Sequence, residues 1–190
     1  MLTTLPYNRE RALLYARRWA LARNPLFNDY SPYGGNCTNF ASQCLLAGAL
    51  VMNFEPTFGW YYRSDSDRAP AWTGVPFFYR FLTENVGEGP YATEQESLEG
   101  GDFIQLGSEE GDFYHTLVVL GKEGEDYLVA AQSDDAYMRP LSTYSYARSR
   151  FLHIEGVRVN TDDGATYFRA LLDGMALPDA LSLVYTVQNS

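Results

Sequence analysis

Cys37 is the residue of this sequence best suited to nucleophilic chemistry. It follows Gly34, Gly35 and Asn36 and opens a stretch whose composition predicts a helix. The first turn of a helix carries unpaired N–H groups and the positive end of the helix dipole, and both favour a thiolate. Cys44 falls two turns further along, where it should be packed and unreactive. We therefore predict Cys37 as the nucleophile, against the simpler interpretation of a small buried apolar residue.

A cysteine nucleophile needs a base, and the chain has two histidines, His115 and His153. His115 precedes the predicted strand 116–120 and follows a polar loop, so its ring could reach a neighbouring helix start. His153 alternates with apolar neighbours and fits a structural sheet residue. The sequence therefore predicts His115 as the base.

A third group should accept the imidazole N–H and hold the other ring nitrogen toward sulfur. Gln132, Asp134 and Asp135 follow the next predicted strand. An amide orients a ring but stabilises imidazolium less than a carboxylate does. We predict Gln132 as this group and keep Asp134 as the alternative, while the Ser-Asp-Asp run fits a simple turn equally well.

No metal or organic cofactor is expected. Cys37 and Cys44 lie seven residues apart, about 10.5 Å along a helix, whereas a disulfide needs Cα atoms within about 7 Å. The spacing is also not one that binds zinc. Two free thiols fit a reducing compartment.

Composition narrows the class of protein. The chain has 190 residues, 46% apolar and 20% charged, with 14 Lys plus Arg against 24 Asp plus Glu and a net charge of −10. These values are typical of a globular domain and argue against nucleic acid as a partner. The sequence contains neither a membrane-spanning run nor a signal peptide. We expect a cytoplasmic protein, or a secreted or cell-surface one if the chain has been trimmed, with its oligomeric state open.

Helices are predicted in the first half of the chain. Asn8 caps a helix that stops by Asn24–Pro25, since the residue before proline avoids helical conformations. A second spans 37–47 with Gly48 as its stop, and a third begins at Pro76. Residues 53–74 between them read as irregular and aromatic.

Strands are predicted in the second half, at 103–106, 116–120, 127–131 and 151–154. Their close spacing favours antiparallel pairing, so the fold class is α+β. Residues 160–164 read as a boundary before a short amphipathic helix at 167–172. We expect a domain at 1–158 and an appendage at 159–190 packed on it.

The nucleophile is expected to face a substrate groove. Its candidate lining is Asn36, Tyr33, Trp60 and Trp72, with the backbone N–H of Cys37 binding the oxyanion. For most of the aromatic residues, a role in the core is the alternative.

Several motifs resemble the bacterial putative amidase domain family, over about residues 5–158. The motifs are Tyr7–Ala16, Asn24–Pro25, Gly35–Gln43, Trp72–Thr73–Gly74, Gly101–Gln105, His115–Val119 and Arg139–Ser142. That family resembles a branch of the papain-like superfamily that includes cell-wall amidases and endopeptidases.

The resemblance implies a papain-like fold, Cys37 as nucleophile and His115 as base. The expected reaction is hydrolysis of an amide, in peptidoglycan or another peptide. The family usually has Asp where Asn36 stands and His where Gln132 stands. A binding module without activity, or an acyl or amide transferase using the same Cys-His pair, are the alternatives.

Overall fold

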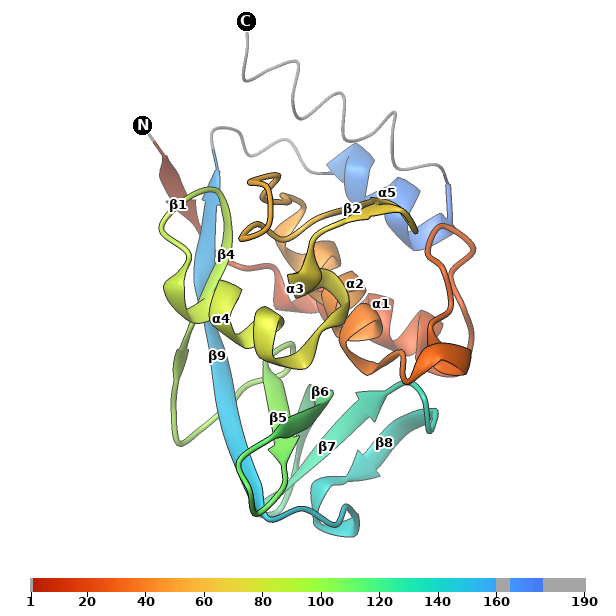
Figure 1. Ribbon diagram of the computed structural model, residues 1–190, viewed down its shortest axis with the longest axis vertical. Coiled ribbons are helices and arrows are strands. Elements are labelled where there is room, and N and C mark those ends of the chain that lie inside the picture. Colours follow the sequence, from red (N-terminus) through yellow and green to blue (C-terminus); the bar gives the residue numbers. More distant parts are fainter. Residues whose placement is uncertain (1, 160–164, 176–190) are drawn as a thin grey trace, which may run out of the picture.

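The computed structural model describes residues 2–159 and 165–175 and has helices on one side of a curled antiparallel sheet (Figure 1). The expected α+β class with an antiparallel sheet is confirmed. The helices are α1 (Arg9–Trp19), α2 (Cys37–Ala49), α3 (Pro70–Thr73), α4 (Val75–Glu84) and α5 (Ala165–Asp173), with short 3-10 turns η1 (Ser31–Tyr33) and η2 (Leu141–Thr143).

Seven strands form the main sheet, in the order β1-β9-β5-β6-β7-β8 with β4 also paired to β9. Their bounds are β1 (Thr3–Leu5), β4 (Gly89–Glu94), β5 (Phe103–Gly107), β6 (Phe113–Glu123), β7 (Asp126–Ala131), β8 (Ala136–Pro140) and β9 (Arg148–Val159). The four predicted strands are β5, β6, β7 and β9, whereas β1, β4 and β8 were not predicted. Within the stretch expected to be irregular, β2 (Tyr62–Ser64), β3 (Asp67–Arg68) and α3 are ordered.

The two faces of the sheet carry separate apolar clusters. Val118 and Ala130, which pair across β6 and β7, belong to the cluster beneath the helices. Val119 and Val129, the next pair, belong to a second cluster on the opposite face. Because side chains alternate along a strand, each position of β6 is assigned to one face.

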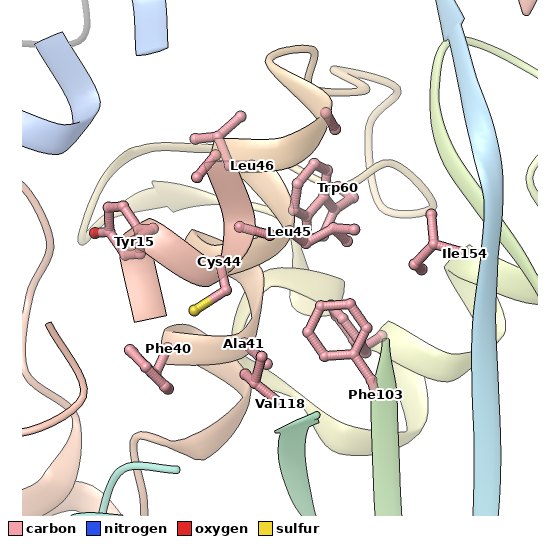
Figure 2. Close-up of a cluster of buried hydrophobic side chains, with 14 of the residues drawn as sticks. Tyr15, Phe40, Ala41, Cys44, Leu45, Leu46, Trp60, Phe103, Val118 and Ile154 are labelled. Carbon is pink, nitrogen blue, oxygen red and sulfur yellow. The ribbon is translucent and has the colours of Figure 1, made fainter. Parts of the chain in front are cut away.

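Helix α2 is the centre of the first cluster, and all 13 of its residues are buried. Figure 2 shows Cys44 among Tyr15, Phe40 and Leu45. Buried polar groups need partners, and those of α2 have them. The bonds join Thr38 to Thr116, Asn39 to Trp72, Ser42 to Trp60 and Gln43 to Tyr15.

Gly48 does not end α2, as the sequence had suggested. The helix continues to Ala49 and closes at Leu50, which has a left-handed φ of 58°. A Cβ on Gly48 would lie 2.2 Å from Cε2 of Tyr7, and the Gly48 carbonyl accepts a hydrogen bond from Asn8 N. The role of Gly48 is therefore to let the segment before α1 pack closely against α2, and the helix ends after it.

Helix α5 packs against the helical layer. Leu171 is fully buried, and its carbonyl accepts a hydrogen bond from Nδ2 of Asn24 at 3.2 Å. The boundary expected at 160–164 lies outside the described residues, as does the chain after 175.

Candidate active site

The turn before α2 is shaped by two glycines with positive φ, Gly34 at 118° and Gly35 at 139°. A Cβ on Gly35 would lie 3.3 Å from Oγ of Ser133. That same Oγ accepts a hydrogen bond from the backbone N–H of Asn36 at 2.5 Å. The turn therefore joins the start of α2 to the end of β7.

Cys37 is the first residue of α2, as predicted, and only 8% of its surface is exposed. Its Sγ lies 3.8 Å from Oγ1 of Thr38. Asn36 occupies the N-cap position without a capping hydrogen bond from its side chain. The N–H groups of a first helical turn have no partner within the helix, so those beside Cys37 are oriented to bind an anion.

The start of α2 is attached to β6 beside the predicted base. Oγ1 of Thr38 lies 3.0 Å from Oγ1 of Thr116, and both residues are buried. Cys37 directly precedes Thr38 in the sequence, and His115 directly precedes Thr116. The fold therefore brings their backbones to neighbouring positions.

The His115 ring, however, belongs to the other face of the sheet. Thr116 faces α2, so alternation turns His115 toward the face of Leu117 and Val119. Its ring centroid lies 5.9 Å from that of Tyr144. Between the described residues, no hydrogen bond joins Cys37 to His115.

Burial lowers the pKa of His115 from its ordinary value of 6.5. The negative charge of Asp134 acts to raise this pKa, and the positive charge of Arg139 acts to lower it. The net direction keeps the imidazole neutral at pH 7. A neutral imidazole is the form that accepts a proton.

Gln132 does not make the hydrogen bond to His115 that the sequence suggested. Its Nε2 donates to the carbonyls of Trp19 at 2.7 Å and Ala22 at 2.8 Å, and its Oε1 accepts from Nδ2 of Asn36 at 2.5 Å. All three partners lie on the helical side of the sheet. Gln132 therefore joins the end of α1 to the start of α2.

The two carboxylates after Gln132 differ in their surroundings. Asp135 forms a paired contact with Arg23, 2.9 Å at each oxygen. Asp134 acts electrostatically on His115. Of the residues predicted for the third position, Asp134 is thus the one whose charge acts on the pKa of His115.

Trp60 and Trp72 are core residues, which corrects their assignment to a substrate groove. Both are 0% exposed, and their ring centroids lie 5.1 Å apart. The indole N–H of Trp60 donates to Ser42 and that of Trp72 donates to Asn39. Tyr33 is 81% exposed in η1, beside the turn that precedes Cys37.

Sequence reasoning missed a polar row beneath the start of α4. Thr116, Gln105 and Arg150 are opposite one another on β6, β5 and β9. The signal in the sequence was Gln105, a polar residue inside the apolar strand Phe-Ile-Gln-Leu. A buried amide in such a strand requires hydrogen-bond partners.

The described residues offer neither a metal-binding cluster nor a membrane-spanning helix. No cluster of three or more His, Cys, Asp or Glu side chains is arranged to hold a metal within the described ranges. None of the helices between residues 2 and 175 that the structure describes has the length and apolarity to cross a membrane.

Comparison with known proteins agrees with the motifs. A family model described as a putative amidase domain matches residues 6–155. YhbB, an uncharacterized protein of Bacillus subtilis (strain 168), is 36% identical over 140 residues, which cover 70% of this chain and 43% of YhbB. The match thus spans less than half of that relative. No solved structure matches the chain.

Proposed function

This chain belongs to the putative amidase domain family, and from that premise we propose that it hydrolyses an amide bond with Cys37 as the nucleophile. The observation that carries the proposal is the position of Cys37 as first residue of an α2 whose N-cap side chain makes no capping bond. This arrangement supplies a thiol and free N–H donors at one point. Donors aimed at a developing oxyanion are among the largest contributions to acyl-transfer catalysis.

The proposed reaction has two steps. His115 takes the proton of Cys37, and the sulfur attacks the carbonyl carbon while first-turn N–H groups of α2 hold the oxyanion. The C–N bond breaks, and the imidazolium gives its proton to the leaving nitrogen. Water, activated by the same imidazole, then cleaves the thioester and returns the free thiol. In a transferase, an amine would replace this water.

For His115, the third residue of β6, to serve as the base, its ring must move from the face of Leu117 toward the start of α2. The attachment of Thr38 to Thr116 supports this, because it keeps the two backbones adjacent. Catalytic hydrogen bonds are often long or poorly aligned before substrate binds. We propose Asp134 as the group that stabilises the resulting imidazolium, since its charge already acts on the ring.

The finer fold assignment and the substrate are part of the same proposal. A buried helix that starts at the nucleophile and packs on an antiparallel sheet bearing the histidine supports a papain-like arrangement. The resemblance to cell-wall amidases makes peptide stems of peptidoglycan the first substrates to test.

A binding module is the second candidate function. It is favoured by one observation, the missing hydrogen bond between Cys37 and His115. In that case Cys37 is only a buried residue of α2, and the start of α2 binds the acyl group of a ligand without cleaving it.

Cleavage by matched variants separates the two functions. Purified peptidoglycan and a pool of peptide amides are incubated with the wild-type chain, Cys37→Ala and Cys44→Ala. A hydrolase loses cleavage with Cys37→Ala and retains it with Cys44→Ala. Absence of cleavage by the wild-type chain, with equal binding by Cys37→Ala, contradicts the hydrolase.

A further inference from the structure

A row of polar side chains leads from the nucleophile to Arg150. Thr116, Gln105 and Arg150 are direct partners on three adjacent strands, and Thr38 of α2 rests on Thr116. Strands are spaced about 4.8 Å apart, so Arg150 lies about 10 Å from β6 across the sheet. Arg150 is therefore linked through Gln105, Thr116 and Thr38 to the helix turn that carries Cys37.

Gln105 fixes the position of the guanidinium. Its Nε2 donates to the Val75 carbonyl at 2.9 Å and to Oγ1 of Thr116 at 3.1 Å. Its Oε1 accepts from Nε of Arg150 at 2.8 Å and from Nη2 at 2.6 Å. A flipped amide would lose these bonds, so the buried side chain has one orientation.

Two aromatic rings also hold the guanidinium. Its central carbon lies 3.5 Å from the ring centroid of Tyr79 and 3.9 Å from that of Phe113. Contacts of this kind orient a planar guanidinium without neutralising its charge. Arg150 is thus held rigidly before any ligand binds.

The charge of Arg150 has no carboxylate in direct contact. Among the described residues, the arginines in ion pairs are Arg9, Arg23, Arg63, Arg68 and Arg80. Glu94 accepts a hydrogen bond from the Tyr79 hydroxyl at 2.5 Å, and its charge acts on Arg150 without a direct contact. Partial burial lowers the pKa of Arg150. A partly buried charge usually has a partner of opposite charge. The chain has ten more acidic than basic residues, so a shortage of carboxylates does not explain why Arg150 forms no ion pair.

We infer that Arg150 recognises a carboxylate of the substrate, so that the chain acts on amides that carry a free carboxylate near the cleaved bond. The inference rests on the proposed function and adds a substrate class to it. The bound Nε and Nη2 leave Nη1 with no hydrogen bond to any described residue. Nη1 is the donor that meets the ligand, as in other arginine–carboxylate contacts. Arg150 is a specificity residue and takes no part in proton transfer.

Affinity labels that need no turnover test this inference. The probes are N-bromoacetyl-β-alanine and its neutral carboxamide, which alkylate a thiol by the same displacement of bromide. Rates of modification of Cys37 are measured by peptide mapping, and the ratio of the carboxylate rate to the carboxamide rate is compared between variants. In the wild-type chain this ratio should be roughly tenfold higher than in Arg150→Met, as for the loss of one charge-assisted contact.

Arg148→Met is the matched control, because Arg148 is an exposed residue of the same strand and its loss removes the same charge. It should leave the ratio within about twofold of wild type, since exposed charges are screened by solvent and salt. Equal ratios in wild type and Arg150→Met, or equal losses in Arg148→Met and Arg150→Met, overturn the inference.

A second measurement applies if Arg150→Met fails to fold or if neither probe modifies Cys37. The Nε–Hε NMR signal of Arg150, assigned with Arg150→Lys, is followed in the full wild-type chain as N-acetyl-β-alanine or its amide is added. A saturable shift with the carboxylate alone supports the inference, and equal or absent shifts overturn it. Failure of peptide cleavage leaves both measurements intact, so the inference and the hydrolase proposal fail separately.

Discussion

Asn36 and Gln132 are hydrogen-bonded to each other, Nδ2 to Oε1 at 2.5 Å. They are also the two positions at which the resemblance to the amidase domain family implied other residues, Asp and His. Two neutral amides thus stand together where an acid and an imidazole are expected. We interpret the two departures as one joint replacement that keeps the end of β7 attached to the start of α2.

A double-mutant cycle tests this joint replacement. Asn36→Asp turns a carboxylate oxygen toward Oε1 of Gln132, which cannot flip because its Nε2 donates to two carbonyls. The single variant should lose about 2 kcal/mol of unfolding free energy, as for a buried acceptor without a donor. Adding Gln132→His supplies a ring N–H, and urea denaturation should show favourable coupling of roughly 1 to 3 kcal/mol. Additive losses in the double variant would contradict the joint replacement.

Cys37 and Cys44 should differ strongly in reactivity. Burial raises the pKa of the Cys44 thiol well above its ordinary value, and its side chain is fully enclosed. Cys37 lies at a helix start with 8% of its surface exposed. Iodoacetamide followed by peptide mapping should modify Cys37 at least about tenfold faster in the native chain. After unfolding in urea the two rates should converge. Equal rates in the native chain would contradict the prediction that Cys37 is the more reactive thiol.

The charges around His115 should move its pKa in opposite directions. Asp134→Asn removes a charge that raises the pKa, and Arg139→Met removes one that lowers it. NMR titration of the imidazole C–H signal, assigned with His115→Asn, should give a midpoint below 6.5 in the wild-type chain. The midpoint should fall in Asp134→Asn and rise in Arg139→Met. Shifts of the same sign would show that these side chains do not act on the ring by charge.

The same lowered pKa gives His115 a defined effect on stability. The folded chain binds a proton at His115 less readily than the unfolded chain, in which the pKa of this histidine is near 6.5. The stabilisation that His115 gives the folded chain is therefore complete above pH 6.5. It is lost as the pH falls through the pKa of His115 in the folded chain. Between pH 7 and 5, the wild-type chain should therefore lose more unfolding free energy than His115→Asn, as measured by urea denaturation.

Local patterns predicted the elements better than they predicted the partners of the side chains. Asn8 as a cap, Cys37 at a helix start and four strands were readable from spacing and turn residues. The roles of Trp60, Trp72 and Gln132 were not, because each depends on a long-range hydrogen bond to α1 or α2. Gly48 shows the same limit, since a helix stop and a close contact with Tyr7 both favour glycine.

Gly48→Ala distinguishes these two reasons for glycine. In an open helix the change would stabilise by about 1 kcal/mol through helix propensity. Here the added Cβ would lie 2.2 Å from the Tyr7 ring, so we expect a loss of roughly 1 to 3 kcal/mol from overpacking. Thermal unfolding gives the sign directly, and a stabilised variant would contradict the close packing of this segment on α2.

Trapping of an acyl intermediate tests the central claim, that Cys37 is an amide-cleaving nucleophile, most directly. The full chain is mixed with peptidoglycan peptides, quenched in acid and examined by intact-mass spectrometry, with Cys37→Ala and Cys44→Ala alongside. We expect an added mass equal to the acyl part of a cleaved peptide, mapped to Cys37, released by hydroxylamine, absent in Cys37→Ala and retained in Cys44→Ala. Cleavage that persists in Cys37→Ala, or an acyl group mapped to another residue, would contradict the claim.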